Sequence, residues 1–230
     1  MALISVSSRP TIGFHPRFIR YHCPLGQTST RFQGWPQGSF SNLYADKEQG
    51  STQYYDTFAS SLKDLFATQT QEYYISAAPL CSNSSAILPP TFYTQTDFVW
   101  VRFYNALKCN IGSVGFNSSL TAWHNSLSQL VGPTSLFPRL YVGGLSFANN
   151  QSGYVLPENF ATAIERAHGK TRSRFGGVML WDGTNGLFTK GADGETFINI
   201  TKTALTSVAQ PALDTFLLQV WDAQRSGLIH

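Results

Sequence analysis

Charged residues are scarce in this chain, and their scarcity excludes several classes of protein. Lys, Arg, Asp and Glu make up only 13% of the 230 residues, and the formal net charge is +3. This positive excess is too small, and the basic residues are too scattered, for a nucleic-acid-binding surface. No run of about 18 apolar residues occurs, so the sequence predicts no membrane span. We therefore expect neither nucleic acid nor a membrane among the partners.

Residues that bind metal ions are also few. The chain has three cysteines and five histidines. His124 and His168 lie in segments predicted to be helical, and neither has Asp, Glu or Cys clustered around it at the spacing of metal ligands. We therefore predict no metal site and no cofactor. The odd number of cysteines leaves one thiol over if the other two form a disulfide bond.

Apolar and aromatic residues are plentiful by contrast. They make up 42% and 14% of the chain, and 230 residues suffice for one large domain with a substantial core. Aromatic side chains offer flat apolar faces for sugar rings, but they also fill large cores, so composition leaves both interpretations open. The oligomeric state does not follow from these features.

Residues 1–43 differ in composition from the rest of the chain. They contain four Arg but no Asp or Glu, and prolines interrupt them at Pro10, Pro16, Pro24 and Pro36. No apolar stretch is long enough for the central region of a signal peptide. The prolines also disfavour the amphipathic helix of a transit peptide. We predict an irregular segment outside the core, followed by a folded domain over residues 44–230.

A pair of carboxylates precedes a predicted helix. Asp46 and Glu48 are two residues apart, so at the end of a strand their side chains share one face. Ser51 or Thr52 can cap the helix that follows. Its apolar residues recur at i, i+3 and i+4, at Tyr55, Phe58, Ala59, Leu62, Leu65 and Phe66. Carboxylates at the end of a strand are typical of α/β-barrel active sites, although Asp-x-Glu is also common in solvated turns.

From residue 72 the chain alternates between predicted strands and helices. Strands are expected over Glu72–Leu80, Phe98–Asn105, Arg139–Phe147 and Phe175–Trp181. Helices are expected around Leu120–Val131, from Pro157 to a stop at Gly169, and over Ala212–Gln224. Strands that alternate with helices form a parallel sheet, and near-continuous apolar strands fit a sheet buried on both faces. The predicted fold class is therefore α/β.

The order of these strand-end motifs resembles the class III chitinases of plants and fungi, which belong to glycoside hydrolase family 18. The similarity runs from Asp46 to about Leu187, through Tyr73–Cys81, Phe98-Val-Trp-Val-Arg-Phe-Tyr-Asn105 and Phe175-Gly-Gly-Val-Met-Leu-Trp181. Asp46-Lys-Glu48 lies where the family's motif Asp-Gly-x-Asp-x-Asp-x-Glu ends. The resemblance implies the five C-terminal strands of a (β/α)8 TIM barrel, truncated at the N-terminus and lacking the first three strands.

The resemblance implies a role for each matching residue. Glu48 would be the general acid that protonates the glycosidic oxygen. Asp46 and Tyr104 would hold the substrate's N-acetyl group, whose carbonyl oxygen attacks the anomeric carbon. Trp181 would be the floor beneath the reacting sugar, followed by a cis peptide bond to Asp182. Without the resemblance, Tyr104 and Trp181 would more commonly be ordinary core residues.

Asn105 and Arg102 complete the predicted substrate-binding residues. Arg102 stands where relatives often have an amide. If it points into the barrel, its charge would lower the pKa of the two carboxylates, and if it points outward it would not. The motif itself also departs from the family, because Tyr44 occupies the position of an earlier Asp and Ser41-Asn42 that of the initial Asp-Gly. The loss of that Asp should weaken catalysis.

The resemblance further implies a disulfide bond between Cys81 and Cys109, which leaves Cys23 free. It also implies an extracellular protein, although the chain shows no signal peptide. Sequons for N-glycosylation occur at Asn83, Asn117, Asn150 and Asn199, which is compatible with secretion. We expect that a mature, active form starts from a different N-terminus.

Three functions follow as hypotheses. The first is a chitinase that hydrolyses β-1,4 bonds between N-acetylglucosamine units of chitin or chito-oligosaccharides, with retention and with the substrate's own acetamido group as nucleophile. The second is a non-catalytic relative that binds chitin oligosaccharides, favoured by Tyr44 and Arg102. The third is an inactive truncated fragment, favoured by the chain length of 230 residues, because a complete barrel needs about 250.

Overall fold

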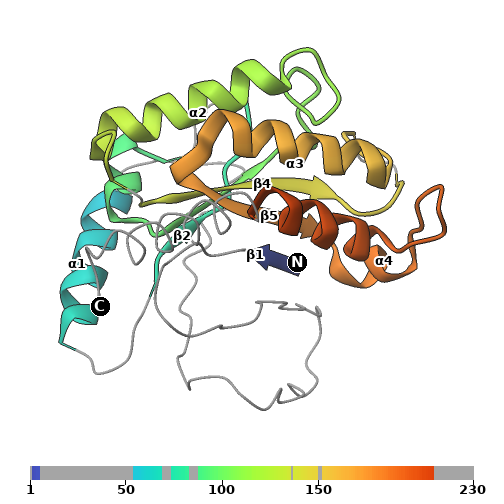
Figure 1. The fold of residues 1–230 in the computed structure, drawn as a ribbon. Helices are drawn as coiled ribbons and strands as arrows, with labels where there is room; N and C mark the ends of the chain where they lie inside the picture. The colour runs from blue at the N-terminus through green and yellow to red at the C-terminus, as the bar shows by residue number, and fades with distance from the viewer. Residues whose placement is uncertain are drawn as a thin grey trace, which may run out of the picture.

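The computed structural model describes residues 2–5, 54–68, 74–82, 88–135, 137–149 and 152–209. Their strands are β1 (Ala2–Ser5), β2 (Ser76–Ala77), β3 (Phe98–Arg102), β4 (Arg139–Leu145) and β5 (Phe175–Trp181). The helices are α1 (Tyr55–Ala67), α2 (Phe116–Val131), α3 (Pro157–Thr171), α4 (Gly183–Phe188), the 3-10 turns η1 (Pro90–Gln95) and η2 (Arg172–Arg174), and a helix over residues 197–209. The two longest of these helices, α2 and α3, lie together over one face of the sheet (Figure 1).

The sheet has the order β1-β5-β4-β3-β2. Strands β2 to β5 are parallel neighbours in chain order, as right-handed βαβ connections produce. This confirms the predicted α/β class, and the arrangement is compatible with part of a TIM barrel. The strand expected to end at Asp46 and Glu48 lies outside the described residues.

Strand β1 pairs antiparallel with β5, from Ala2 opposite Leu180 to Ser5 opposite Gly177. The sequence predicted no regular element within residues 1–43, so this short strand is a difference from that prediction. The pairing is made by main-chain amides at a sheet edge, and four residues are too few to show a sequence period. The remainder of that segment lies outside the described residues, so the domain boundary near residue 44 stays a prediction.

Strand β5 has the predicted bounds, whereas β3 and β4 end earlier than predicted. The ladder continues for one residue beyond β3, because the Phe103 amide donates to the Gly143 carbonyl over 3.0 Å. The chain then turns at Asn105, whose φ of 59° is left-handed. Such a residue cannot remain in a strand, which explains why the aromatic run ends its pairing early.

The main core lies between the sheet and the helices that cover it. Alternate residues of β3, Val99 and Val101, are buried on this outer face together with Phe103. Apolar side chains from α2 and α3 pack against them, at Phe116, Leu120, Trp123, Leu127, Phe160, Ala163, Ile164 and Ala167. A side chain at Gly144 would overlap the Phe160 ring, so glycine permits the close approach of α3 to β4.

Helix α1 buries a narrower stripe than its sequence predicted. Ala59 is fully buried, and Leu62 is partly buried against the main core, but Phe58 and Leu65 are 48% and 59% exposed. The helix packs chiefly against η1 rather than across the sheet, so only the middle of its apolar stripe is buried in the core (Figure 1). The predicted capping residues, at positions 51 and 52, lie outside the described residues.

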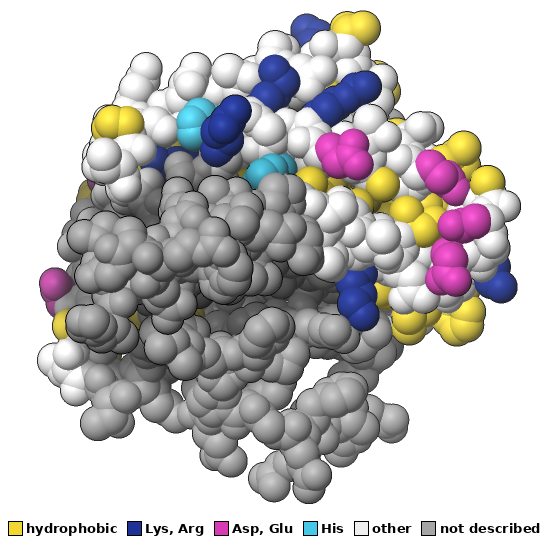
Figure 2. Space-filling model, viewed as in Figure 1, with side chains coloured by type: hydrophobic (Ala, Val, Ile, Leu, Met, Phe, Trp, Pro, Cys, Tyr) yellow, Lys and Arg dark blue, Asp and Glu magenta, His cyan; other side chains and the backbone are white. Residues whose placement is uncertain are grey.

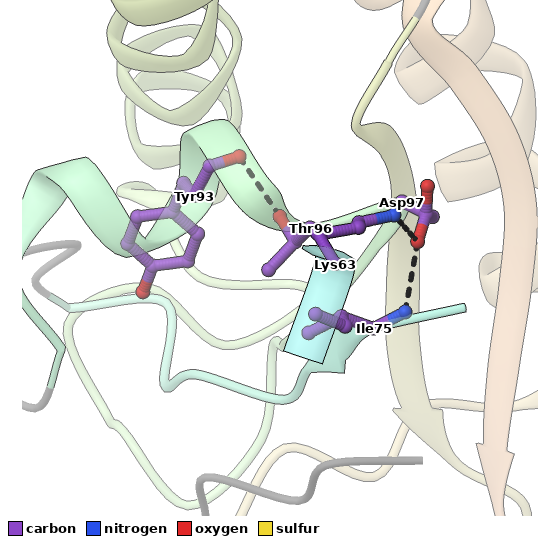
Figure 3. A network of polar contacts seen from close by, with 5 residues as sticks. All are labelled: Lys63, Ile75, Tyr93, Thr96 and Asp97. Carbon is purple, nitrogen blue, oxygen red and sulfur yellow. Dashed lines mark hydrogen bonds and ion pairs between the residues drawn. The ribbon is translucent and has the colours of Figure 1, made fainter. Parts of the chain in front are cut away.

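A polar contact ties α1 to the start of β3. The Lys63 ammonium lies 2.6 Å from the Asp97 carboxylate, and the same carboxylate oxygen accepts the Ile75 amide over 2.8 Å. Figure 3 shows these bonds beside that of Thr96, whose hydroxyl donates to the Tyr93 carbonyl over 3.0 Å. Asp97 therefore joins three segments at the N-terminal end of the sheet, opposite the end where α/β barrels carry their chemistry.

Helix α3 continues past Gly169, where the sequence predicted its end. It ends instead at Thr171, because the capping residue Arg172 has a φ of 35°, which breaks the helix. Nearby, Arg174 is buried, and its guanidinium donates to the carbonyls of Phe137, Pro138 and Gly132 over 3.1 to 3.3 Å. Gly132 caps the C-terminus of α2, so this cation satisfies one of the carbonyls that a helix end leaves open.

The described part of the chain also holds helices that the sequence did not predict. Residues 197–209 form a helix, which begins at the buried residues Phe197 and Ile198. The helix predicted over Ala212–Gln224 lies outside the described residues. No helix in the described ranges is both long and apolar enough to cross a membrane. In the space-filling view, acidic side chains gather at the right of the described part, whereas Lys and Arg side chains are spread over it (Figure 2).

Candidate functional site

The inner face of the sheet, opposite α2 and α3, is aromatic. Its buried cluster comprises Ala78, Trp100, Tyr104, Tyr141, Leu145 and Met179. The rings of Trp100 and Tyr141, which are partners in the β3–β4 register, lie 3.9 Å apart between centroids. Side chains alternate between the two faces of a strand, so Trp100 and Tyr104 lie on the face opposite Val101. The same strands thus contribute to two different surfaces.

Tyr104, Leu145 and Trp181 form one row at the carboxyl ends of three neighbouring strands. Leu145 is the register partner of Trp181. Tyr104 lies two residues after Arg102, which pairs with Gly143, and it shares the inner cluster with Leu145. The two aromatic residues therefore flank Leu145, separated by two strand spacings or about 10 Å. The structure brings these two predicted site residues to the same end of the sheet.

The two aromatic residues differ in exposure. Tyr104 is 5% exposed and belongs to the inner cluster, whereas Trp181 is 43% exposed. An exposed indole offers its face to a ligand, and a buried tyrosine offers its hydroxyl at most. The row can therefore provide a flat apolar platform beside a hydrogen-bonding group.

The chain after Trp181 is held by several polar contacts. The peptide bond between Trp181 and Asp182 is cis, as the resemblance implied. The Asp182 carboxylate caps α4, because it accepts the Asn185 amide and side chain, each over 2.8 Å. From the end of β4, the Ser146 amide donates to the Trp181 carbonyl over 3.0 Å, and its hydroxyl donates to the Asp182 carbonyl.

Arg102 lies on the inner face, because it alternates with the outward-facing Val101 and precedes Tyr104 by two residues. This settles the orientation that the sequence left open, and the side chain is half-buried. Asn105 is exposed, and its amide donates to the Ser152 carbonyl over 2.8 Å, which joins the loops after β3 and β4. Both residues therefore border the carboxyl end of the sheet.

The carboxylates Asp46 and Glu48 lie outside the described residues, as does Tyr44. Their roles and the influence of Arg102 on their pKa values stay predictions. In the described ranges no group of three or more His, Cys, Asp and Glu side chains is placed to hold a metal ion.

Cys81 and Cys109 form a disulfide bond, with Cα atoms 5.9 Å apart. The pairing implied by the resemblance is thus present. The Cys81 carbonyl accepts the Ser119 hydroxyl over 2.6 Å and the Trp123 indole N–H over 3.3 Å. These bonds attach the loop after β2 to helix α2, and the disulfide joins it to the loop after β3. Cys23 lies outside the described residues.

Ser146 is a residue near the site that sequence reasoning missed. It is fully buried directly after β4, between the row of site residues and α4. A serine after an apolar strand carries no family motif and no hydrophobic period. Its position at the carboxyl end of a predicted strand is the one signal that could have singled it out.

Comparison with known proteins identifies relatives over much of the chain. No model of a known protein family matches it. An endochitinase of Saccharomyces cerevisiae is 31% identical over 174 residues, which cover 74% of this chain and 29% of that protein. An acidic endochitinase of Cicer arietinum is 33% identical over 165 residues, which cover 70% and 52%. The chain thus spans about half the length, or less, of these curated relatives.

Solved structures share the fold. The chitinase ICChI from Ipomoea carnea superposes with a TM-score of 0.50 at 28% identity, covering 63% of this chain and 50% of its own. The xylanase and α-amylase inhibitor protein XAIP-II from Scadoxus multiflorus gives 0.52 at 21% identity, covering 70% and 53%. Concanavalin B gives 0.55 at 17% identity, covering 72% and 56%. The last two likenesses show the fold alone, and a chitinase and an inhibitor protein both adopt it.

Proposed function

Because this chain belongs to the chitinases of glycoside hydrolase family 18, we propose that it acts on chitin or its oligosaccharides. The reaction is hydrolysis of the β-1,4 bond between N-acetylglucosamine units, with retention at the anomeric carbon. The observation that carries the proposal is the row of Tyr104, Leu145 and Trp181 at the carboxyl ends of the strands. Parallel α/β sheets bind their substrates at that end.

Each residue has a task in this reaction. Glu48 donates a proton to the glycosidic oxygen as the bond breaks. The substrate's acetamido oxygen attacks the anomeric carbon, so no protein nucleophile is needed. Asp46 accepts the acetamido N–H, and the Tyr104 hydroxyl donates to the acetamido oxygen. Water then opens the cyclic intermediate, and Glu48 takes back the proton that this water loses.

Trp181 supports binding rather than proton transfer. Its indole is 43% exposed at the end of β5, so it can stack on the apolar face of a pyranose ring. About 10 Å separates it from Tyr104, since the two lie two strand spacings apart. One sugar ring can therefore rest on the indole while its acetamido group reaches toward the tyrosine hydroxyl. Asn105, exposed beside them, is the further substrate contact that we propose.

Arg102 gives this site an electrostatic feature of its own. Its side chain lies on the inner face, two residues before Tyr104. A guanidinium near Glu48 favours the ionised carboxylate and lowers its pKa. The general acid must be protonated, so a lower pKa of Glu48 shifts the pH range of activity, and with it the pH–rate profile, toward lower pH. Arg102→Gln should move that profile toward higher pH.

The test is hydrolysis and binding of chitotetraose by the wild-type chain and by Glu48→Gln. Loss of the acid should lower turnover by about 10²- to 10⁴-fold and leave the dissociation constant within a few-fold, because glutamine keeps the shape of the side chain. Calorimetry of binding and product analysis supply the two measurements. A wild-type chain that neither binds nor hydrolyses the sugar would refute the proposal.

A second candidate function is binding of chitin oligosaccharides without hydrolysis. Tyr44 occupies the position of an Asp in the family motif, and Arg102 stands where relatives often have an amide. Both changes weaken the acid chemistry more than they weaken stacking on Trp181. Under this alternative, the wild-type chain binds chitotetraose and releases no product, and Glu48→Gln binds equally well.

A further inference from the structure

Ser146 contacts two successive carbonyl groups at the site. Its main-chain amide donates to the Trp181 carbonyl over 3.0 Å, and its side-chain hydroxyl donates to the Asp182 carbonyl. The residue is fully buried and directly follows Leu145, the register partner of Trp181. One residue at the end of β4 thus fixes the backbone on both sides of the link between Trp181 and α4.

This backbone contact matters because Trp181 is partly exposed. With 43% of its surface exposed, the residue is less enclosed than Tyr104, which is buried among other aromatic side chains. The direction of its Cα–Cβ bond, which the backbone sets, helps to determine where the ring points. A platform that is already oriented binds a ring at a lower entropic cost.

The packing around Ser146 leaves its hydroxyl little freedom. A Cβ added at Gly186 would lie 3.2 Å from the Ser146 Cβ and 3.1 Å from the Ile198 side chain, so helix α4 lies directly over the serine. The other side of the same link is held by the Asp182 carboxylate, which caps α4 through Asn185. Trp181 is thus followed by a segment that is anchored both to β4 and to α4.

We propose that Ser146 is a positioning residue that orients the Trp181 indole for stacking on a sugar ring. The role rests on the proposed function, because it supposes that Trp181 binds a pyranose. Ser146 touches no substrate itself. It acts through the Asp182 carbonyl, which its hydroxyl keeps in place.

The test compares Ser146→Ala with Ser119→Ala. Ser119 is a matched control, because its hydroxyl also donates to a main-chain carbonyl, that of Cys81 over 2.6 Å, in the disulfide region beside α2. Calorimetry with chitotetraose should give roughly three- to tenfold weaker binding for Ser146→Ala and no change for Ser119→Ala. Urea unfolding should show similar stability losses for both. Unchanged affinity in Ser146→Ala, or equal weakening in both variants, would overturn the proposal.

A second measurement needs no sugar and separates this inference from the proposed function. The acrylamide quenching of Trp181 alone is obtained by subtracting the signal of a Trp181→Phe counterpart from that of each variant. Ser146→Ala should change the quenching of Trp181, while Ser119→Ala should leave it as in the wild type. If the quenching changes in Ser146→Ala but the wild-type chain binds no sugar, Ser146 still orients Trp181, and the proposed function is refuted. Unchanged quenching in Ser146→Ala would refute the positioning itself.

Discussion

The two faces of the sheet in this molecule carry different kinds of side chain. On the outer face, aliphatic residues such as Val99, Val101 and Val142 meet the apolar sides of α2 and α3. On the inner face, Trp100, Tyr104 and Tyr141 predominate. The strands are the same, and adjacent residues on each strand serve different faces.

This difference indicates that the outer face mainly stabilises the fold, whereas the end of the inner face mainly serves binding. The outer face buries hydrocarbon against helices, which stabilises the fold in proportion to the area removed from water. The inner face ends in a row that contains the buried Tyr104 and the exposed Trp181. Substitutions on one face should therefore change the free energy of unfolding, and substitutions at the end of the other should change binding and turnover.

The largest effect should come from the outer face. Phe160 on α3 is fully buried against Phe197, with ring centroids 5.2 Å apart. Phe160→Ala should reduce the free energy of unfolding by about 3–5 kcal/mol, because it removes buried area and leaves a cavity. Urea unfolding followed by circular dichroism measures this. Phe188→Ala is the control, since Phe188 is 77% exposed and should change stability little. Equal losses would contradict the separation of roles.

The next effect belongs to the inner face and concerns turnover. Tyr104→Phe removes the hydroxyl proposed to contact the acetamido group and should lower kcat for chitotetraose by about 10²-fold. Tyr141→Phe is the matched control, because Tyr141 is equally buried but two layers deeper, paired with Trp100. Product analysis by chromatography gives the rates. Similar rates in both variants would remove Tyr104 from the proposed mechanism.

A smaller effect on stability should come from Asp97, which lies at the N-terminal end of β3, the strand that contributes to both faces. Asp97→Ala leaves the Ile75 amide and the Lys63 ammonium without their carboxylate and should cost about 1–3 kcal/mol of stability. Lys63→Met should cost no more than about 1 kcal/mol, because this ion pair is partly exposed. The urea unfolding midpoints of the two variants measure and compare these losses. A larger loss in Lys63→Met would show that the ion pair outweighs the amide contact.

The smallest effect should be a pH dependence of outer-face stability. Burial, with a further contribution from Arg172, lowers the pKa of His168, whose ring lies 5.7 Å from that of Phe175. Protonation thus costs more in the folded state, so the contribution of neutral His168 is present above the unfolded pKa of about 6.5 and decreases below it. Between pH 7.5 and 5.5, wild-type urea midpoints should fall slightly more than those of His168→Gln. Parallel changes would refute this assignment.

The strands and helices with clear periods could be predicted from the sequence. β5 and the C-terminal end of α2 at Gly132 matched, because their apolar patterns and stop signals act locally. The early end of β3 could not be predicted, since it depends on a left-handed Asn105 and on pairing with a distant loop. The exposed residues of α1 were misassigned because a helical stripe does not reveal how wide a partner surface is.

The candidate site was predictable only where a family motif marked it. Tyr104 and Trp181 follow recognisable strand ends, and the structure brings them into one row. The role of Ser146 could not be predicted beyond its position at a strand end, because it lies in two bonds to the last residue of β5 and the residue after it, more than thirty positions away. Such contacts exist only once β4 and β5 have paired, and no local pattern encodes them.

The buried Arg174 has a consequence for how this chain is made. The carbonyl of Gly132 at the end of α2 receives its guanidinium donor from a residue 42 positions later. At typical translation rates, this interval corresponds to about 2 to 8 seconds of synthesis. During that time the Gly132 carbonyl lacks its guanidinium partner. A nascent chain that stops before Arg174 therefore lacks the donor that this helix-end carbonyl has in the complete fold.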